Sequence, residues 1–163
     1  MKRIAILIVE DEPEVRQAIE RDLETFTTCF RIEACEDVAD ARDILATLAS
    51  DADLPGLILC DHRLPGTSGV DFLTELESSG TQPGLRKVLL TGQADQADTI
   101  RAINRGGLDR YIAKPWNAGE LRDVVGTQLT EFILDQEIDP LPYLGILSDP
   151  RLLDRIGRGP RVD

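Results

Sequence analysis

Five short strand-like stretches, each followed by a helix-like pattern, most constrain how this chain can fold. The stretches cover residues 4–9, 30–35, 57–60, 87–91 and 110–113. After the first one, apolar residues recur at helical spacing from Val15 to Phe26, and Pro13 suits the first position of a helix. Strands that alternate with helices form βαβ units, so the sequence predicts an α/β fold with a five-stranded parallel sheet covered on both faces.

Composition narrows the class of protein. The chain has 163 residues, which suits one domain with a short appendage. Its net charge of −12 argues against sequence-independent nucleic-acid binding, which needs a basic surface, and no apolar run approaches the length of a membrane span. The three cysteines are odd in number and lack metal-ligand spacing, so we expect reduced core thiols in a cytoplasmic protein.

Polar side chains stand where four of the strand-like stretches end. Glu10 and Asp11 follow the first stretch, Asp61 follows the third, Thr91 ends the fourth and Lys114 follows the fifth. Taken singly, each residue is also explained as a helix start, a turn or a loop. Ligands of parallel α/β sheets bind outside the carboxyl ends of the strands, so the four positions together predict one polar pocket.

The motifs VEDEP, LILCDHRLPGTSG, VLLTG and YIAKPW carry these residues in a characteristic order. Over roughly residues 2–128 the chain resembles the receiver domain of two-component response regulators. The resemblance implies a flavodoxin-like, doubly wound sheet in the strand order 2-1-3-4-5. It divides the chain into a receiver domain at residues 1–128 and a short helical C-terminal extension, or the start of a linker to an absent output domain, at residues 129–163.

The resemblance also implies a chemistry for the pocket. Asp61 would be the nucleophile that accepts a phosphoryl group, while Lys114 and Thr91 would contact the phosphoryl oxygens. Thr91 would then move toward the phosphate and let Tyr111 turn inward, which would change the surface around the fourth helix and fifth strand. A static, half-buried Tyr111 is the alternative. Such a protein is no enzyme in the usual sense, because it catalyses only its own phosphoryl transfer and dephosphorylation.

The implied cofactor is Mg²⁺. Asp11, Asp61 and the backbone carbonyl of Arg63 resemble the direct ligands of the family, and Glu10 would act mainly through a bound water. The family more often has aspartate at the position of Glu10, but the charge is kept, so we expect a working metal site. Arg63 and Gln93 match positions that modulate the lifetime of the phosphoryl group.

Two other functions are weighed against the receiver. A phosphatase or hydrolase of similar fold would need a second acid two residues after Asp61, where Arg63 stands. A receiver-like interaction module that works without phosphorylation would usually lack the acceptor, the acids or the lysine, and this chain keeps all of them. His62 is the only histidine and adjoins Asp61, but strand alternation is expected to turn the two side chains to opposite sides.

An apolar pattern continues beyond the expected end of the receiver. The last helix, from about Asn117, keeps its apolar stripe to Ile133, and further apolar residues follow the two prolines and extend to Ile156. They could fold back on the receiver, pair with a second chain in a homodimer, or begin the absent output domain. The implied partners are a sensor histidine kinase or phosphotransfer protein and a downstream protein, with no direct contact to nucleic acid or membrane.

Overall fold

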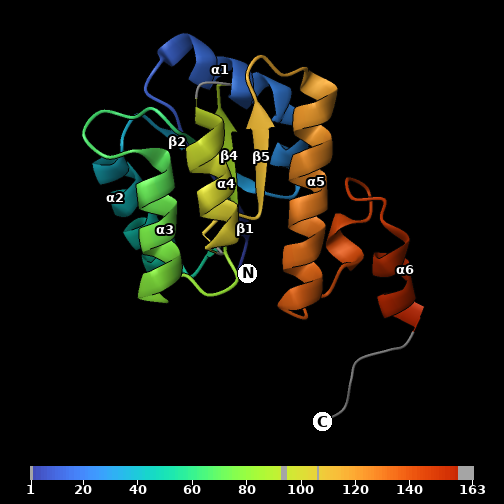
Figure 1. Cartoon of the computed structure of the whole chain (residues 1–163). Coiled ribbons are helices and arrows are strands. Elements are labelled where there is room, and N and C mark those ends of the chain that lie inside the picture. The colour runs from blue at the N-terminus through green and yellow to red at the C-terminus, as the bar shows by residue number, and fades with distance from the viewer. Residues whose placement is uncertain (1, 93–94, 106, 158–163) are drawn as a thin grey trace.

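The computed structural model describes residues 2–92, 95–105 and 107–157. Its five strands form one parallel sheet in the order β2-β1-β3-β4-β5, as Figure 1 shows. The strands are β1 (Ile4–Val9), β2 (Arg31–Cys35), β3 (Leu54–Asp61), β4 (Arg86–Thr91) and β5 (Arg110–Ala113). The predicted fold class and strand order are confirmed. Strand β3 is longer than expected, because it begins at Leu54 and includes Asp61.

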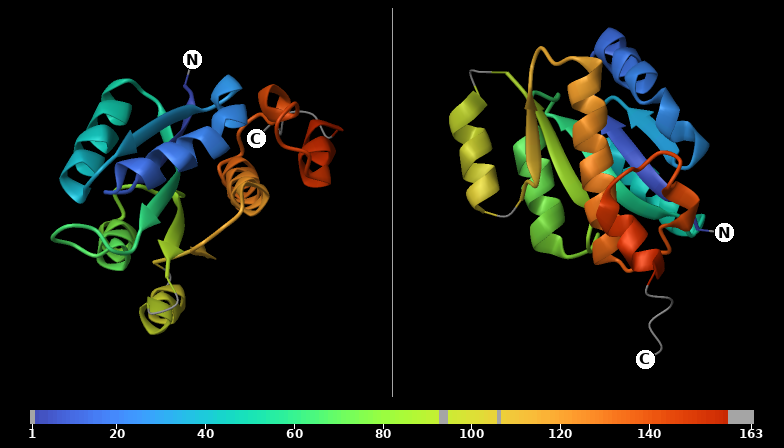
Figure 2. Two further views of the ribbon diagram at one scale, coloured as in Figure 1. Left: turned by 90° about the horizontal axis from the view of Figure 1, so that it is seen from above. Right: turned by 90° about the vertical axis from the view of Figure 1, so that its right-hand side faces the viewer.

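Helices cover both faces of the sheet. The helical elements are α1 (Pro13–Asp22), η1 (Glu24–Thr28), α2 (Val38–Ser50), α3 (Gly69–Ser79), α4 (Gln96–Asn104), α5 (Ala118–Asp135), η3 (Leu141–Tyr143) and α6 (Pro150–Gly157). Figure 2 shows α1 and α5 on one face, and α2, α3 and α4 on the other. Among the described residues, no helix combines the length and the apolar character needed to cross a membrane.

Polar caps fix where three of these helices begin. Asp37, Ser68 and Asn117 each precede a helix and accept a hydrogen bond from the backbone N–H three residues later, at 2.8, 3.1 and 2.7 Å. These bonds satisfy N–H groups that have no partner within the helix. At the other end of α3, Gly80 adopts a φ of 64°, a left-handed conformation that glycine reaches without steric cost.

Alternation along β1 divides the core into two clusters. Ile4, Ile6 and Ile8 pack with α1 and α5, whereas the intervening Ala5, Leu7 and Val9 pack with α2, α3 and α4. The strand is buried along its whole length, as expected for the centre of a parallel sheet. The strand arrows point upward in Figure 1, so the carboxyl ends of all five parallel strands lie at the top of that view. This end of the sheet is called the carboxyl edge below.

Residues 136–157, here called the C-terminal segment, fold back on the receiver. Tyr143, Leu147 and Leu152 are buried in the cluster formed with α1 and α5, and the rings of Tyr143 and Phe30 stack with centroids 5.1 Å apart. Figure 1 places the segment beside the lower half of α5, away from the carboxyl ends of the strands. Helix α5 itself continues through residue 128 to Asp135. Gln93 and residues 158–163 lie outside the described residues.

Candidate functional site

The sheet register brings the predicted pocket residues to one edge. Val9 pairs with Cys60, so Glu10 and Asp61 leave neighbouring strands at the same level. The Glu10 N–H donates to the Cys35 carbonyl at 3.0 Å, and the Lys114 N–H donates to the Thr91 carbonyl at 2.8 Å. The ladder thus extends past the last strand residues and holds both backbones in place.

A glycine brings α3 against the backbone of Asp61. The Gly69 N–H donates to the His62 carbonyl at 2.8 Å, and a Cβ at position 69 would lie 2.1 Å from the Asp61 carbonyl oxygen. A larger residue would therefore push the helix and the acceptor strand apart. Close packing of α3 at this point fixes the backbone that presents Asp61.

Three carboxylates gather at the edge. Glu10, Asp11 and Asp61 offer oxygens that all lie within 4.8 Å of one another. Glu10 is fully buried at 0% exposure, and its Oε1 accepts the Glu12 N–H at 3.2 Å. Within the described residues its other oxygen, Oε2, has no hydrogen-bond partner.

Lys114 balances part of this negative charge. Its Nζ lies 2.5 Å from Asp61 Oδ1 and 3.6 Å from Glu10 Oε2. Burial lowers the pKa of the lysine, but the hydrogen bond and charge of Asp61, with the charge of Glu10, outweigh burial and raise it. Lys114 is therefore a fixed cation at the acceptor carboxylate.

Lys114 compensates the negative charge of Glu10 only in part. Burial, and then the charge of Asp61, raise the pKa of Glu10 from 4.5 to about 7, although Lys114 and the Glu12 N–H act in the opposite direction. A carboxylate in this state gains from any further cation that approaches it. The pocket therefore favours a ligand with positive charge.

The donor set fits Mg²⁺, the hard cation that the family generally uses. All the clustered groups offer oxygen, and Oε2 of Glu10, which lies near Lys114 but accepts no hydrogen bond within the described residues, could accept one from a metal-bound water. The Arg63 carbonyl stays a prediction as a ligand. The Arg63 side chain points elsewhere and donates to both oxygens of Asp95 at 3.1 Å.

The loop after β5 holds Lys114 between two anchors. Trp116, the only tryptophan of the chain, is half-buried and packs against the core cluster of α1 and α5. Asn117 then caps α5 through the Glu120 N–H. These two contacts, together with the backbone bond to Thr91, limit how far Lys114 can move.

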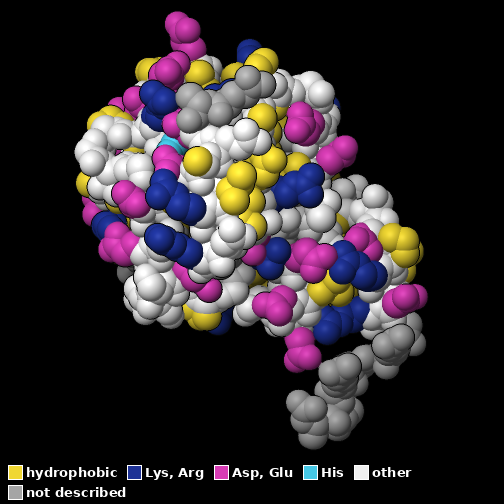
Figure 3. Space-filling view, in the orientation of Figure 1, with side chains coloured by type: hydrophobic (Ala, Val, Ile, Leu, Met, Phe, Trp, Pro, Cys, Tyr) yellow, Lys and Arg dark blue, Asp and Glu magenta, His cyan; other side chains and the backbone are white. Residues whose placement is uncertain are grey.

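Thr91 and Tyr111 occupy different environments. Thr91 is buried, donates its hydroxyl to the Gly92 carbonyl at 3.2 Å and accepts from the Thr99 hydroxyl at 3.5 Å. Tyr111 is 42% exposed and lies with Ile100 and Ile103 on the face of α4 and β5, where Figure 3 shows apolar side chains gathered. The switch role of the pair stays a prediction.

Sequence reasoning missed three residues around the pocket. Arg16 donates to the Glu10 carbonyl at 2.8 Å, Thr99 contacts Thr91, and Asp95 pairs with Arg63. Their positions in the sequence give little signal, because each reaches the pocket from a helix or helix start whose approach is set by packing. Asp95 alone had a usable signal, since an aspartate before an apolar-periodic stretch suggests a helix start.

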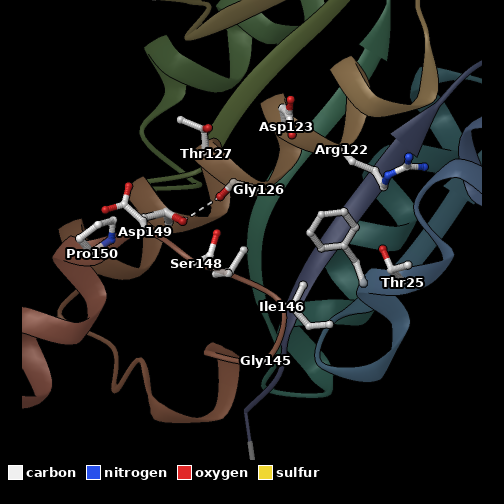
Figure 4. Close-up of a pocket in the computed structure, with 13 residues that line it drawn as sticks. Thr25, Arg122, Asp123, Gly126, Thr127, Gly145, Ile146, Ser148, Asp149 and Pro150 are labelled. Carbon is white, nitrogen blue, oxygen red and sulfur yellow. Dashed lines mark hydrogen bonds between the residues drawn. The ribbon is translucent and has the colours of Figure 1, made fainter.

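A hollow of about 660 Å³ lies elsewhere, between the C-terminal segment, η1 and α5. Figure 4 shows its lining, which includes Arg122, Asp123, Thr127, Ser148 and Asp149. None of the predicted site residues lines it. The hollow is therefore separate from the carboxylates at the carboxyl ends of the strands, where Asp61 itself is only 5% exposed.

A match between a family model and most of this chain shows which family it belongs to. The model of the response regulator receiver domain family matches residues 6–126, which carry every pocket residue described above and the whole sheet except the first two residues of β1. The chain belongs to this family. The C-terminal segment lies beyond the matched residues.

Curated relatives are longer than this chain. The hydrogenase transcriptional regulatory protein HoxA of Cupriavidus necator is 32% identical over 124 residues, which cover 76% of this chain and 24% of HoxA. The phosphate regulon transcriptional regulatory protein PhoB of Escherichia coli is 34% identical over 116 residues, covering 71% of this chain and 47% of PhoB. The receiver chain thus spans between about a quarter and a half of these relatives.

Solved structures agree with the fold. The signal receiver domain of an HD domain-containing protein from Pseudomonas fluorescens superposes with a TM-score of 0.72 at 25% identity, covering 84% of this chain and 94% of that one. NtrX from Brucella abortus, solved in complex with ADP, gives a TM-score of 0.66 at 27% identity, covering 86% of this chain and 30% of NtrX.

Proposed function

We propose that this receiver domain accepts a phosphoryl group on Asp61 from a sensor histidine kinase or phosphotransfer protein, in a Mg²⁺-dependent reaction. The observation that carries the proposal is the 2.5 Å contact of Lys114 with Asp61, beside the two further carboxylates of Glu10 and Asp11. A carboxylate held only for stability would need one partner. Here Asp61 contacts the Lys114 ammonium group and lies beside two further carboxylates, and the three carboxylates together could supply part of the coordination shell of a metal ion.

The transfer uses the groups at this edge in separate roles. A carboxylate oxygen of Asp61 attacks phosphorus, the bond from phosphorus to the donor nitrogen breaks, and an acyl phosphate forms. Lys114 moves from the carboxylate to a phosphoryl oxygen, and the Thr91 hydroxyl donates to another. Asp11, Asp61 and, through a water, Glu10 would hold Mg²⁺, which would supply neutralisation of the phosphoryl charge. Hydrolysis later releases phosphate, so the domain catalyses only reactions of its own acceptor.

The phosphoryl group would be read at the face of α4 and β5. Thr91 turns from Gly92 and Thr99 toward the phosphate, which frees space for the exposed ring of Tyr111 to move inward. The exposed apolar side chains of α4 then take a new arrangement, to which a downstream protein or an output domain binds. We place this signalling in the cytoplasm, which keeps thiols reduced, because the three cysteines of the chain are free.

Intact-mass measurement after incubation with acetyl phosphate and Mg²⁺ tests the proposal. The native chain is expected to gain the mass of one phosphoryl group, and Asp61→Asn or added EDTA is expected to abolish the gain. Asp71→Asn, which changes an exposed aspartate on α3, is the matched control and should be phosphorylated normally. An unmodified native chain would instead support the interaction module that works without phosphate.

A further inference from the structure

A second group of potential ligands lies on the other side of the acceptor loop. The side chain of His62 turns away from the carboxylate cluster and faces Asp95 and Asp98, at the start of α4. His62 is only 7% exposed, and its Nε2 is the ring nitrogen that faces the two carboxylates. Within the described residues the other ring nitrogen, Nδ1, has no hydrogen-bond partner. The ring is therefore held by packing and by the charges opposite Nε2, which leaves Nε2 available as a ligand atom.

The distances suit a shared cation better than a direct contact. Nε2 of His62 is 3.8 Å from Asp95 Oδ1 and 3.5 Å from Asp98 Oδ2, which is long for hydrogen bonds. In a tetrahedral site with bonds of about 2.1 Å, two ligand atoms are about 3.4 Å apart. All three ligand atoms lie within 4.8 Å of one another.

The two carboxylates are available to a metal. Asp95 and Asp98 are three residues apart at the start of one helix, so their side chains lie on the same face. Asp98 binds Arg101 through Oδ1 and directs Oδ2 to the imidazole. Asp95 pairs with Arg63, whose side chain is 73% exposed. An ion pair this exposed contributes little to stability, so a metal could replace Arg63 at small cost.

The structure assigns to His62, Asp95 and Asp98 a second metal site, for a transition-metal dication such as Zn²⁺, that joins the loop after β3 to the first turn of α4. One imidazole and two carboxylates are ligands that Zn²⁺ accepts, with a water in the fourth position. Mg²⁺ prefers an all-oxygen environment, so the histidine separates this site from the carboxylate cluster.

Occupancy would hold α4 near the acceptor. Thr99, in the same first turn, donates to the Asp95 carbonyl at 3.0 Å and contacts the Thr91 hydroxyl. A metal that fixes Asp95 and Asp98 therefore also restrains the neighbour of Thr91. An effect on signalling rests on the proposed function, whereas binding itself does not.

Titration of the full chain with ZnCl₂, in saturating Mg²⁺ and with a phosphine to keep the thiols reduced, tests the site. Because His62 is the only histidine, its imidazole NMR signals report the site directly. We expect these signals to shift with one equivalent of Zn²⁺. His62→Gln and Asp98→Asn should each weaken binding at least about tenfold. Asp98 is partly exposed, so its variant should fold even if His62→Gln does not.

Two controls separate this site from others. Asp40→Asn, in the exposed acidic group of Glu36, Asp37 and Asp40, should leave Zn²⁺ affinity unchanged. Asp61→Asn should also keep it, which separates the result from the test of phosphorylation. Displacement of Zn²⁺ by Mg²⁺, undiminished binding by both ligand variants, or an imidazole unaffected by Zn²⁺ would overturn the assignment.

Discussion

The carboxyl edge of the sheet and the flank beneath the C-terminal segment differ in how completely their groups are satisfied. At the edge, Glu10 is buried with one oxygen lacking a hydrogen bond, and Lys114 is shared between Glu10 and Asp61, beside a third carboxylate. On the flank, Tyr143 stacks on Phe30 and apolar side chains fill the space against α5. The contrast indicates that the flank stabilises the fold, while the edge holds unfavourable charge that binding can relieve.

Removal of the flank should have the largest effect. A chain that ends at Asp135 loses the burial of Tyr143, Leu147 and Leu152, each worth roughly 1.5–3 kcal/mol. We expect its free energy of unfolding to fall by about 4 kcal/mol or more in urea titrations. A chain that ends at Gly157 keeps the C-terminal segment and should match the full chain.

Equal stability of the two truncated chains would show that the segment is only loosely attached. Sedimentation of the same chains also tests the homodimer, which stays a prediction. Leu153 and Ile156 remain exposed on α6 and are the apolar side chains available there for a second chain.

Removing the charge of Glu10 at the carboxyl edge should raise the free energy of unfolding, whereas truncation lowers it. In EDTA at pH 8, Glu10→Gln should raise the free energy of unfolding, by at most about 3.4 kcal/mol at 1.36 kcal/mol per pH unit. The folded pKa of about 7 lies above the usual 4.5 of this carboxyl. The folded state therefore holds a proton that the unfolded state releases, so native stability falls as pH rises from 4.5 to 7.

The pH dependence provides the control for this variant. Well below pH 4.5 the carboxyl is protonated in both states, so the advantage of Glu10→Gln should vanish there. Glu14→Gln, at an exposed position in α1, should show no such dependence. An advantage of Glu10→Gln that persists at low pH would point to packing instead of charge.

Mg²⁺ should change the free energy of unfolding less than either the truncation or Glu10→Gln. At ten times its dissociation constant it should stabilise the native chain by about 1.4 kcal/mol through mass action. Protonation of Glu10 competes with the metal, so the gain in melting temperature at a fixed Mg²⁺ concentration should be smaller at pH 6 than at pH 8. Glu10→Gln should lose most of this pH dependence, and an unchanged profile would separate Glu10 from the metal.

Much of the fold could be predicted because β1 and residues 57–60 of β3 are continuous apolar runs, as expected for the centre of a parallel sheet. The start of β3 is an exception. Pro55 and Gly56 suggest a turn, yet both lie within the strand, where the pairing with β1 shifts register between Ala5 and Ile6. A local irregularity of this kind depends on the neighbouring strand, so the sequence of β3 alone could not reveal it.

In the candidate site, too, some features could be predicted from the sequence and others could not. Which residues reach the carboxyl edge follows from where each strand ends, and Glu10, Asp61, Thr91 and Lys114 could be named from the sequence. The contacts between His62 and the start of α4 could not, because they depend on how a helix packs. The fate of the apolar C-terminal residues was also open, since burial within one chain and burial between two chains require the same pattern.

The position of Trp116 gives the molecule an optical reporter. It is the chain's one tryptophan, it lies two residues beyond Lys114, and its ring is divided between the core and the surroundings. Indole emission depends on the polarity around the ring, so any rearrangement of the Lys114 loop changes the fluorescence of the unlabelled protein. We therefore expect the proposed metal binding and phosphorylation to be visible as changes in tryptophan emission, without a dye and without a partner protein.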